Sequence, residues 1–99
     1  MVKVIWTDQS IDDINNIAEF IAKDSFKYAQ IQVNTFFDLA LLLEKSPKMG
    51  RRVPGTNDDS IRELITGSYR IIYKIRTEKE ILIITVHHSS RLMTNNPNI

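Results

Sequence analysis

Residues 62–73 read Arg62-Glu-Leu-Ile-Thr-Gly-Ser-Tyr-Arg-Ile-Ile-Tyr73, and residues 81–88 read Ile81-Leu-Ile-Ile-Thr-Val-His-His88. Between residues 68 and 76 the side chains alternate, with tyrosines and isoleucines on one face and mostly cationic side chains on the other. Thr66-Gly-Ser68 and Thr77-Glu-Lys-Glu80 are turn sequences. The pattern therefore predicts three antiparallel strands, at residues 61–65, 68–76 and 81–88.

One strand and two amphipathic helices are predicted before this meander. Val2-Lys-Val-Ile-Trp6 is typical of a short strand, and Ser10-Ile-Asp-Asp13 fits a capping box that opens a helix. Ser25 caps a second helix, which ends before Ser46-Pro47 because proline disfavours a helical residue before it. The apolar stripes of the two helices are formed by Ile11, Ile14, Ile17, Ala18 and Ile21, and by Ala29, Val33, Phe36, Phe37, Ala40, Leu41 and Leu43.

These elements predict a single α+β domain with the order β-α-α-β-β-β. Because the linker between the helices is short, the two helices form an antiparallel hairpin, which we expect to pack on a small antiparallel sheet. The domain is assigned to residues 1–93, and residues 94–99 are assigned to a C-terminal tail.

Composition narrows the class of protein. The 99 residues include no cysteine, which excludes disulfides and thiolate metal sites. The two histidines are adjacent in a predicted strand, so they point to opposite faces and cannot bind one metal ion together. We therefore expect neither a metal site nor a cofactor. No apolar run approaches a membrane span or a signal peptide, so a cytoplasmic protein is expected. Residues 1–44 carry three lysines and seven acids (−4), and residues 45–99 carry ten basic residues and five acids (+5). This asymmetry indicates either an anionic partner or a solvated strand face.

Several side chains are candidates for binding or chemistry. The predicted binding arginines are Arg51, Arg52, Arg62, Arg70 and Arg91. For Arg62 and Arg91, functional and structural roles are equally favoured, whereas Arg70 is predicted to pair with a helix acid such as Asp12, Asp13 or Glu19. His88 is a candidate acid or base, although a half-buried structural histidine is favoured, and Tyr69 and Tyr73 are predicted to pack against the helices.

Six short motifs occur in a familiar order. They are Trp6 at the end of the first strand, Pro47…Gly50-Arg51, Val53-Pro54, Ile61-Arg-Glu-Leu64, Tyr69-Arg-Ile-Ile-Tyr73 and His88-x-x-Arg91. With this order and spacing, residues 2–93 resemble the ParE/RelE superfamily of bacterial toxins from type II toxin–antitoxin modules. The resemblance implies a cognate antitoxin whose disordered tail folds on the toxin, and direct DNA binding only through that antitoxin.

The superfamily has two branches that act differently. RelE-like toxins cleave mRNA on the ribosome without a metal. In this chain the candidate residues for such a reaction would be His88 and Glu63 for proton transfer, and Arg62 and Arg91 for binding the phosphate. ParE-like toxins block DNA gyrase by binding. RNA-cleaving relatives commonly carry a late tyrosine and a lysine cluster before the second strand, but this chain has no tyrosine after Tyr73. The ParE-like branch, without hydrolytic chemistry, is therefore favoured over the mRNA endonuclease and over an inactive toxin homologue.

Overall fold

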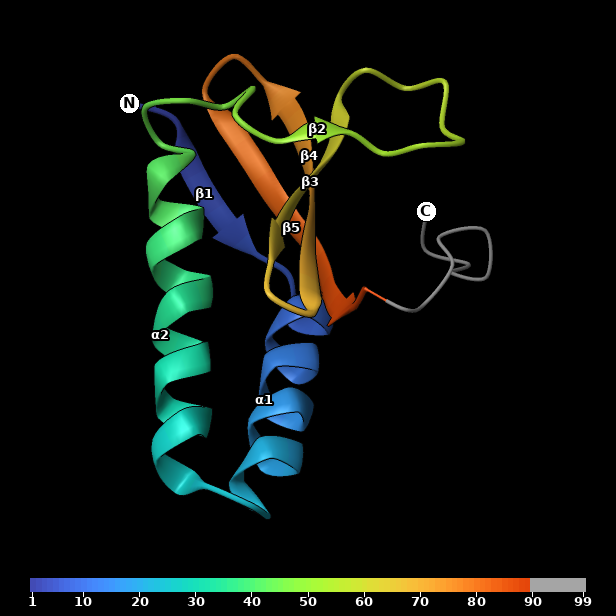
Figure 1. Cartoon of the computed structure of the whole chain (residues 1–99). Helices are drawn as coiled ribbons and strands as arrows, with labels where there is room; N and C mark the ends of the chain where they lie inside the picture. The colour runs from blue at the N-terminus through green and yellow to red at the C-terminus, as the bar shows by residue number, and fades with distance from the viewer. Residues whose placement is uncertain (90–99) are drawn as a thin grey trace.

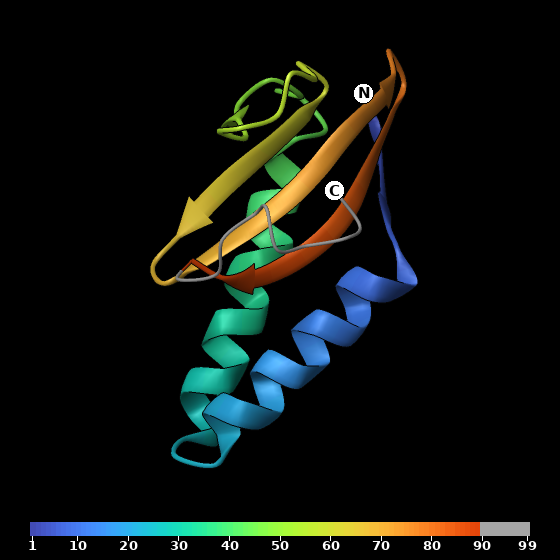
Figure 2. The same cartoon turned by 90° about the vertical axis from the view of Figure 1, so that its right-hand side faces the viewer.

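Residues 1–89, which the computed structural model describes, form two helices packed on one side of a five-stranded sheet (Figures 1 and 2). The elements are β1 (Lys3–Trp6), α1 (Asp8–Ala22), α2 (Phe26–Leu42), β2 (Arg51–Arg52), β3 (Ile61–Thr66), β4 (Tyr69–Thr77) and β5 (Glu80–His88). In both views the turn that joins the helices projects beyond the end of the sheet. The predicted α+β class and the helical hairpin are confirmed.

The sheet is mixed rather than antiparallel. Its strand order is β1-β5-β4-β3-β2, and β3, β4 and β5 form the predicted meander. β1 runs parallel to β5, with Lys3 opposite Glu80 and Trp6 opposite Ile83. The prediction of a wholly antiparallel sheet is wrong because β1 and β5 are separated by both helices and three strands, so no tight turn between them requires opposite directions. β1 thereby covers the edge that β5 would otherwise expose.

β2 is a two-residue strand that the sequence did not predict. Arg51 pairs with Glu63 and Arg52 with Arg62 of β3, in the segment between the predicted second helix and the predicted meander, for which no element was predicted. The neighbouring residues Gly50 and Pro54 are typical of turns, so the local sequence does not predict a strand here.

α1 begins earlier than the capping-box pattern predicts. Thr7 is the N-cap residue, and its Oγ1 accepts a hydrogen bond from the Ser10 amide at 3.2 Å. Ser10 lies inside the helix, where its hydroxyl donates to the Thr7 carbonyl oxygen at 2.7 Å. Asp13, the expected acid of the box, points to the sheet instead. The predicted capping box is therefore wrong, whereas the predicted Ser25 cap of α2 is confirmed.

A β-bulge interrupts β5. Ile72 of β4 lies opposite Thr85, but the next residue, Tyr73, lies opposite Ile83, so Ile84 is an extra residue in β5. Because side chains alternate between faces, one extra residue exchanges the faces of all the side chains that follow it. Strict alternation of faces along β5 therefore holds only up to the bulge.

α1 is attached to the sheet at this bulge. The Thr7 hydroxyl donates to the carbonyl oxygens of Ile83 at 2.7 Å and Ile84 at 3.1 Å. The Asp13 carboxylate accepts a hydrogen bond from the Val86 amide at 3.0 Å. Backbone groups that the irregular strand pairing leaves exposed are thus bonded by side chains from the start of α1.

The hydrophobic core lies between the hairpin and the sheet. It consists of Ile14, Phe36, Ala40, Leu43, Leu64, Ile71, Tyr73, Ile81, Ile83 and Val86. Phe37 and Leu41, which were predicted to belong to the same apolar stripe of α2, are exposed. Phe37 directly follows the core residue Phe36, and Leu41 directly follows the core residue Ala40. Neighbouring residues of an α-helix lie about 100° apart around its axis, so a residue that follows a core residue points away from the core.

Candidate functional site

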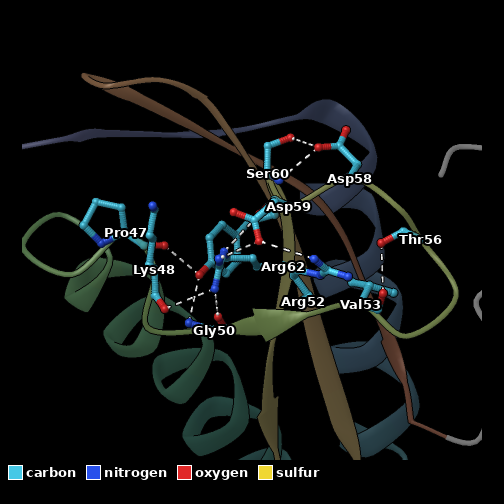
Figure 3. Close-up of polar contacts among 11 residues, drawn as sticks. Pro47, Lys48, Gly50, Arg52, Val53, Thr56, Asp58, Asp59, Ser60 and Arg62 are labelled. Atoms are coloured by element: carbon cyan, nitrogen blue, oxygen red, sulfur yellow. Dashed lines mark hydrogen bonds and ion pairs between the residues drawn. The ribbon is translucent and has the colours of Figure 1, made fainter.

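Arg62 holds together the loop on either side of β2 (Figure 3). Its Nη1 donates to the Gly50 carbonyl oxygen at 2.9 Å, and its Nε donates to the Asp59 carbonyl oxygen at 3.1 Å. Its Nη2 forms an ion pair with the Asp59 carboxylate at 3.2 Å. These contacts give Arg62 a structural role, one of the two roles that the sequence left open.

Tyr73 anchors the same loop from β4. Its side chain is fully buried, and its hydroxyl accepts a hydrogen bond from the Gly50 amide at 2.9 Å and donates to the Pro47 carbonyl oxygen at 2.7 Å. Tyr69 is partly buried and meets Phe36 edge to face, with ring centroids 5.6 Å apart. The predicted packing of both tyrosines against the helices is confirmed.

The phenol of Tyr73 makes folding stability sensitive to alkaline pH. Burial raises the pKa of Tyr73, although the hydrogen bond from Gly50 and the charge of Arg62 lower it in part. Folding therefore favours the neutral phenol, so its contribution is fully present below about pH 10 and is lost as the pH rises through the folded-state pKa. We expect Tyr73→Phe to show a shallower loss of stability above about pH 10 than the wild type in urea unfolding curves.

Tyr28→Phe is the matched control, because Tyr28 is exposed on α2. Its hydroxyl has no buried backbone partner among residues 1–89, so Tyr28→Phe should change the free energy of unfolding at neutral pH by less than about 0.5 kcal/mol. At neutral pH, Tyr73→Phe should lower the free energy of unfolding by about 1–3 kcal/mol, because the buried Gly50 amide and the partly buried Pro47 carbonyl oxygen lose their partner. Equal alkaline profiles for Tyr73→Phe and the wild type would contradict the assignment.

Glu63 lies on the face of the sheet opposite to Arg62, as the alternation predicts. Its carboxylate is fully buried, and it accepts hydrogen bonds from Arg51 Nε at 2.7 Å and Arg70 Nη1 at 3.3 Å. Arg70 also donates to the Ser89 carbonyl oxygen at 2.7 Å. The predicted pairing of Arg70 with a helix acid is wrong, because Arg70 projects from the face of β4 that points away from the helices.

Every arginine among residues 1–89 takes part in an ion pair. Arg51 and Arg70 pair with Glu63, Arg52 and Arg62 with Asp59, and Arg76 with Glu80. Five guanidinium groups thus share three carboxylates, and the expected cationic face is partly neutralised. Among the predicted binding arginines in this part of the chain, Arg51 and Arg52 have the most exposed side chains, at 59% and 56%.

The two histidines differ sharply in exposure. His87 is buried, whereas His88 is exposed and its ring meets Tyr69 edge to face at a centroid distance of 5.5 Å. Strict alternation would place His88 on the same face as Leu82, but the bulge between them places it on the helix side with Tyr69 and Val86. The prediction of a half-buried His88 is wrong, because the side chain is exposed at the end of the strand.

The candidate catalytic side chains do not converge. Arg62 and His88 lie on the helix side opposite β4 positions four residues apart, which corresponds to about 13 Å along the strand. Glu63 lies on the other face of the sheet. Arg91 lies outside the described residues. Acid–base catalysis requires groups within hydrogen-bond reach of one substrate, and Arg62, His88 and Glu63 do not meet that condition.

The helical hairpin carries an exposed apolar surface that the sequence interpretation missed. Its large members are Phe20, Phe26, Tyr28, Ile31, Phe37, Leu41 and Leu42. A groove of about 230 Å³ between the helices is lined mainly by Ala18, Ala22, Phe26, Ala29 and Val33, and a groove of about 420 Å³ between β1 and α2 is lined by Val4, Trp6, Phe37 and Leu41 among others. We call these two depressions the hairpin grooves. The available signal was that α2 carries large apolar residues around most of its circumference.

Metal-binding clusters and membrane-spanning helices are both absent from residues 1–89. No three histidine, acidic or cysteine side chains among residues 1–89 lie close enough together to hold a metal ion. Neither helix of that part of the chain has the length and apolar character needed to cross a membrane.

The fold is similar to that of chains in solved toxin–antitoxin structures. A chain described as a chromosomal ParDE toxin–antitoxin system from P. aeruginosa superposes with a TM-score of 0.71 at 18% identity, covering 89% of this chain and 96% of that one. The RelBE2 toxin–antitoxin complex from Mycobacterium tuberculosis gives a TM-score of 0.63 at 19% identity, covering 88% and 96%. At these identities the likeness establishes the fold.

Similarity in sequence assigns the chain to a family. No curated protein sequence matches the chain. The family model for the ParE toxin of the type II toxin–antitoxin system parDE matches residues 4–93, which is nearly the whole chain. The chain therefore belongs to the ParE toxin family of type II toxin–antitoxin systems.

Proposed function

We propose that this toxin acts in the cytoplasm by binding DNA gyrase, and that a cognate antitoxin neutralises it. Family membership and the fold support the toxin class. The observation that carries the choice of a binding mechanism is the separation of Arg62, His88 and Glu63. An mRNA endonuclease would need a proton acceptor, a proton donor and a phosphate clamp around one scissile bond.

The exposed arginines of β2 are our candidates for contact with the target. Arg51 and Arg52 are neighbours in a strand, so their side chains leave the sheet on opposite faces of the same edge. Guanidinium groups bind carboxylates in a bidentate manner, which suits an acidic patch on a protein. Glu63 and Asp59 partly neutralise these arginines, which makes this edge of the sheet a weak binding surface for phosphate groups. This supports contact with DNA through the antitoxin rather than through this chain.

The hairpin grooves are our candidates for the antitoxin. An amphipathic segment that folds on binding would place apolar side chains along Phe26 and Val33 between the helices, and along Phe37 and Leu41 beside β1. Covering these residues would also remove apolar surface that a free toxin exposes to water.

Expression of the toxin without antitoxin tests the proposed target. We expect cells to filament and to induce DNA-damage signalling while translation continues at first, and we expect the purified toxin to inhibit supercoiling of relaxed plasmid by gyrase. The double variant Arg51→Ala/Arg52→Ala should inhibit supercoiling about tenfold less well.

Arg76→Ala is the matched control for this variant. Arg76 is an exposed, ion-paired arginine of the same sheet, but it lies outside β2 and its loop. It should inhibit gyrase as the wild type does. Cut mRNA and a halt in translation before any DNA damage would reject the proposal in favour of the endonuclease. Normal growth with a folded toxin would indicate an inactive homologue.

A further inference from the structure

A pocket of about 400 Å³ opens between α1 and the neighbouring ends of β4 and β5, apart from both hairpin grooves. It is lined by Asp13, Asn16, Ile17, Phe20, Tyr69, Val86, His87 and His88. We call it the α1–β5 pocket. Its volume falls within the range of about 300–1,000 Å³ that is usual for ligand sites.

One stripe of α1 forms a whole wall of this pocket. Asp13, Asn16, Ile17 and Phe20 are spaced by three and four residues, so they lie on the same side of the helix. The stripe begins with a carboxylate, continues with an amide and ends with an aromatic ring. This sequence of groups along one wall suits an elongated ligand with a polar, cationic part near Asp13.

The carboxylate of Asp13 is fixed in place but is not paired with a cation among residues 1–89. It accepts hydrogen bonds from the Val86 amide at 3.0 Å, from the Thr85 hydroxyl, and from Gln9 Nε2 at 2.8 Å. No lysine or arginine among residues 1–89 lines the pocket, and its basic side chains in that part of the chain are His87 and His88. The net charge of −4 over residues 1–44, three lysines against seven acids, adds an attractive field for a cation.

Aromatic rings from both layers of the fold line the pocket, Tyr69 from the sheet opposite the α1 wall and Phe20 at the far end of that wall from Asp13. Tyr69 lies edge-on between Phe36 and His88, with centroid distances of 5.6 and 5.5 Å, which fixes its orientation. Phe20 at the rim is 67% exposed. The Lys23 Nζ already lies 6.0 Å from the Phe20 ring centroid, at the outer limit of a cation–π contact. Rings beside a carboxylate are the usual surroundings of a bound organic cation.

We propose that the α1–β5 pocket binds an arginine side chain of a protein partner. The flat guanidinium group stacks on an aromatic ring and at the same time donates hydrogen bonds to a carboxylate and an amide oxygen. A lysine ammonium provides a point charge without the flat face, so arginine is preferred. Recognition of arginine here does not depend on whether gyrase or an antitoxin supplies it.

Small probes test the pocket on the intact protein. We expect N-acetyl-arginine amide to shift the ring resonances of Phe20, Tyr69 and His88 in NMR titrations. N-acetyl-citrulline amide has nearly the same shape but no charge, and it should bind about tenfold more weakly or not at all. N-acetyl-lysine amide should fall between the two.

Two neighbouring asparagines give a matched pair of variants. Asn16→Lys places a cation on the pocket wall and should weaken arginine binding about tenfold. Asn15→Lys adds the same charge at an exposed position of α1 that does not line the pocket, and it should weaken binding less than about twofold. Phe20→Ala should weaken binding several-fold, and Phe26→Ala, an exposed ring outside the pocket, should not.

Three results would overturn the proposal. Equal binding of the citrulline probe would mean that charge is not recognised. Equal weakening by Asn15→Lys and Asn16→Lys would mean that only the general acidic field acts. An arginine probe that leaves the three rings unshifted up to its solubility limit would mean that the pocket does not bind the side chain. None of these results bears on gyrase inhibition, so the two proposals can fail separately.

Discussion

Gly50→Ala is expected to destabilise the toxin by about 2–4 kcal/mol, through overpacking and the loss of buried hydrogen bonds. A Cβ atom at residue 50 would lie 2.6 Å from the Glu63 carbonyl oxygen and 2.7 Å from the hydroxyl and a ring carbon of Tyr73. The first atom belongs to the backbone of β3 and the others to a fully buried ring, so neither neighbour is free to move away. Relief requires the loop to shift, which breaks the contacts of Gly50 with Tyr73 and Arg62.

Urea unfolding followed by circular dichroism measures this effect, and Gly67→Ala is the control. A Cβ atom at Gly67 would meet no atom within 4 Å, but its φ of +56° is unfavourable for alanine, so a cost of about 1–2 kcal/mol is expected. The cost at Gly50 is steric, because its φ is not in the left-handed region. Wild-type stability of Gly50→Ala, or a larger loss for Gly67→Ala, would refute the close packing of this loop.

Arg70→Ala is expected to destabilise the fold by about 2–3 kcal/mol, whereas Arg51→Ala should cost less than about 1 kcal/mol. Both residues pair with the buried Glu63, and the shorter contact belongs to Arg51, at 2.7 Å against 3.3 Å. Distance alone would thus favour Arg51. However, the Coulomb energy also varies inversely with the effective dielectric constant, which changes several-fold between surface and interior. The Arg70 side chain is 18% exposed and that of Arg51 59%, so burial decides.

Double-mutant cycles with Glu63→Gln separate the two pairs from other losses. Each cycle removes the contribution of the arginine stem to packing and leaves the coupling to the carboxylate. We expect the coupling of Glu63 to Arg70 to be at least twice that to Arg51, and only the second to fall strongly at high salt. A larger coupling for Arg51 would mean that contact distance outweighs burial at this site.

The sequence predicted well the elements whose signals are local. The alternation around Tyr69 and Ile71 follows from packing of their face against the helices, although Ile72 on the other face is also fully buried, and Ser25 caps α2 through its own side chain. Both signals lie within a few residues of the structure that they specify. This is why the meander, the hairpin and the burial of Tyr73 followed directly from the pattern.

The misplaced features depend on contacts between distant segments. Asp13 has the position of a capping acid but bonds to Val86, which is 73 residues away in the chain. Arg70 could have paired with several acids, and the sheet pairing that brings Glu63 beside it is not visible in local sequence. The α1–β5 pocket likewise joins residues of α1 to residues beyond position 68. Residue type identified the candidates, but tertiary pairing determined which of them meet.

The bulge in β5 has an evolutionary consequence. Its extra residue, Ile84, lies between a core segment ending at Ile83 and the pair His87 and His88, so deletion of one residue here would exchange the faces of the two histidines. The core positions before Ile84 would keep their neighbours, whereas Val86, a core residue beyond the bulge, would change faces with the histidines. A lineage of such toxins could therefore move a whole set of strand-end side chains from one surface to the other in a single mutational step, and change partners with the core adjusted at Val86.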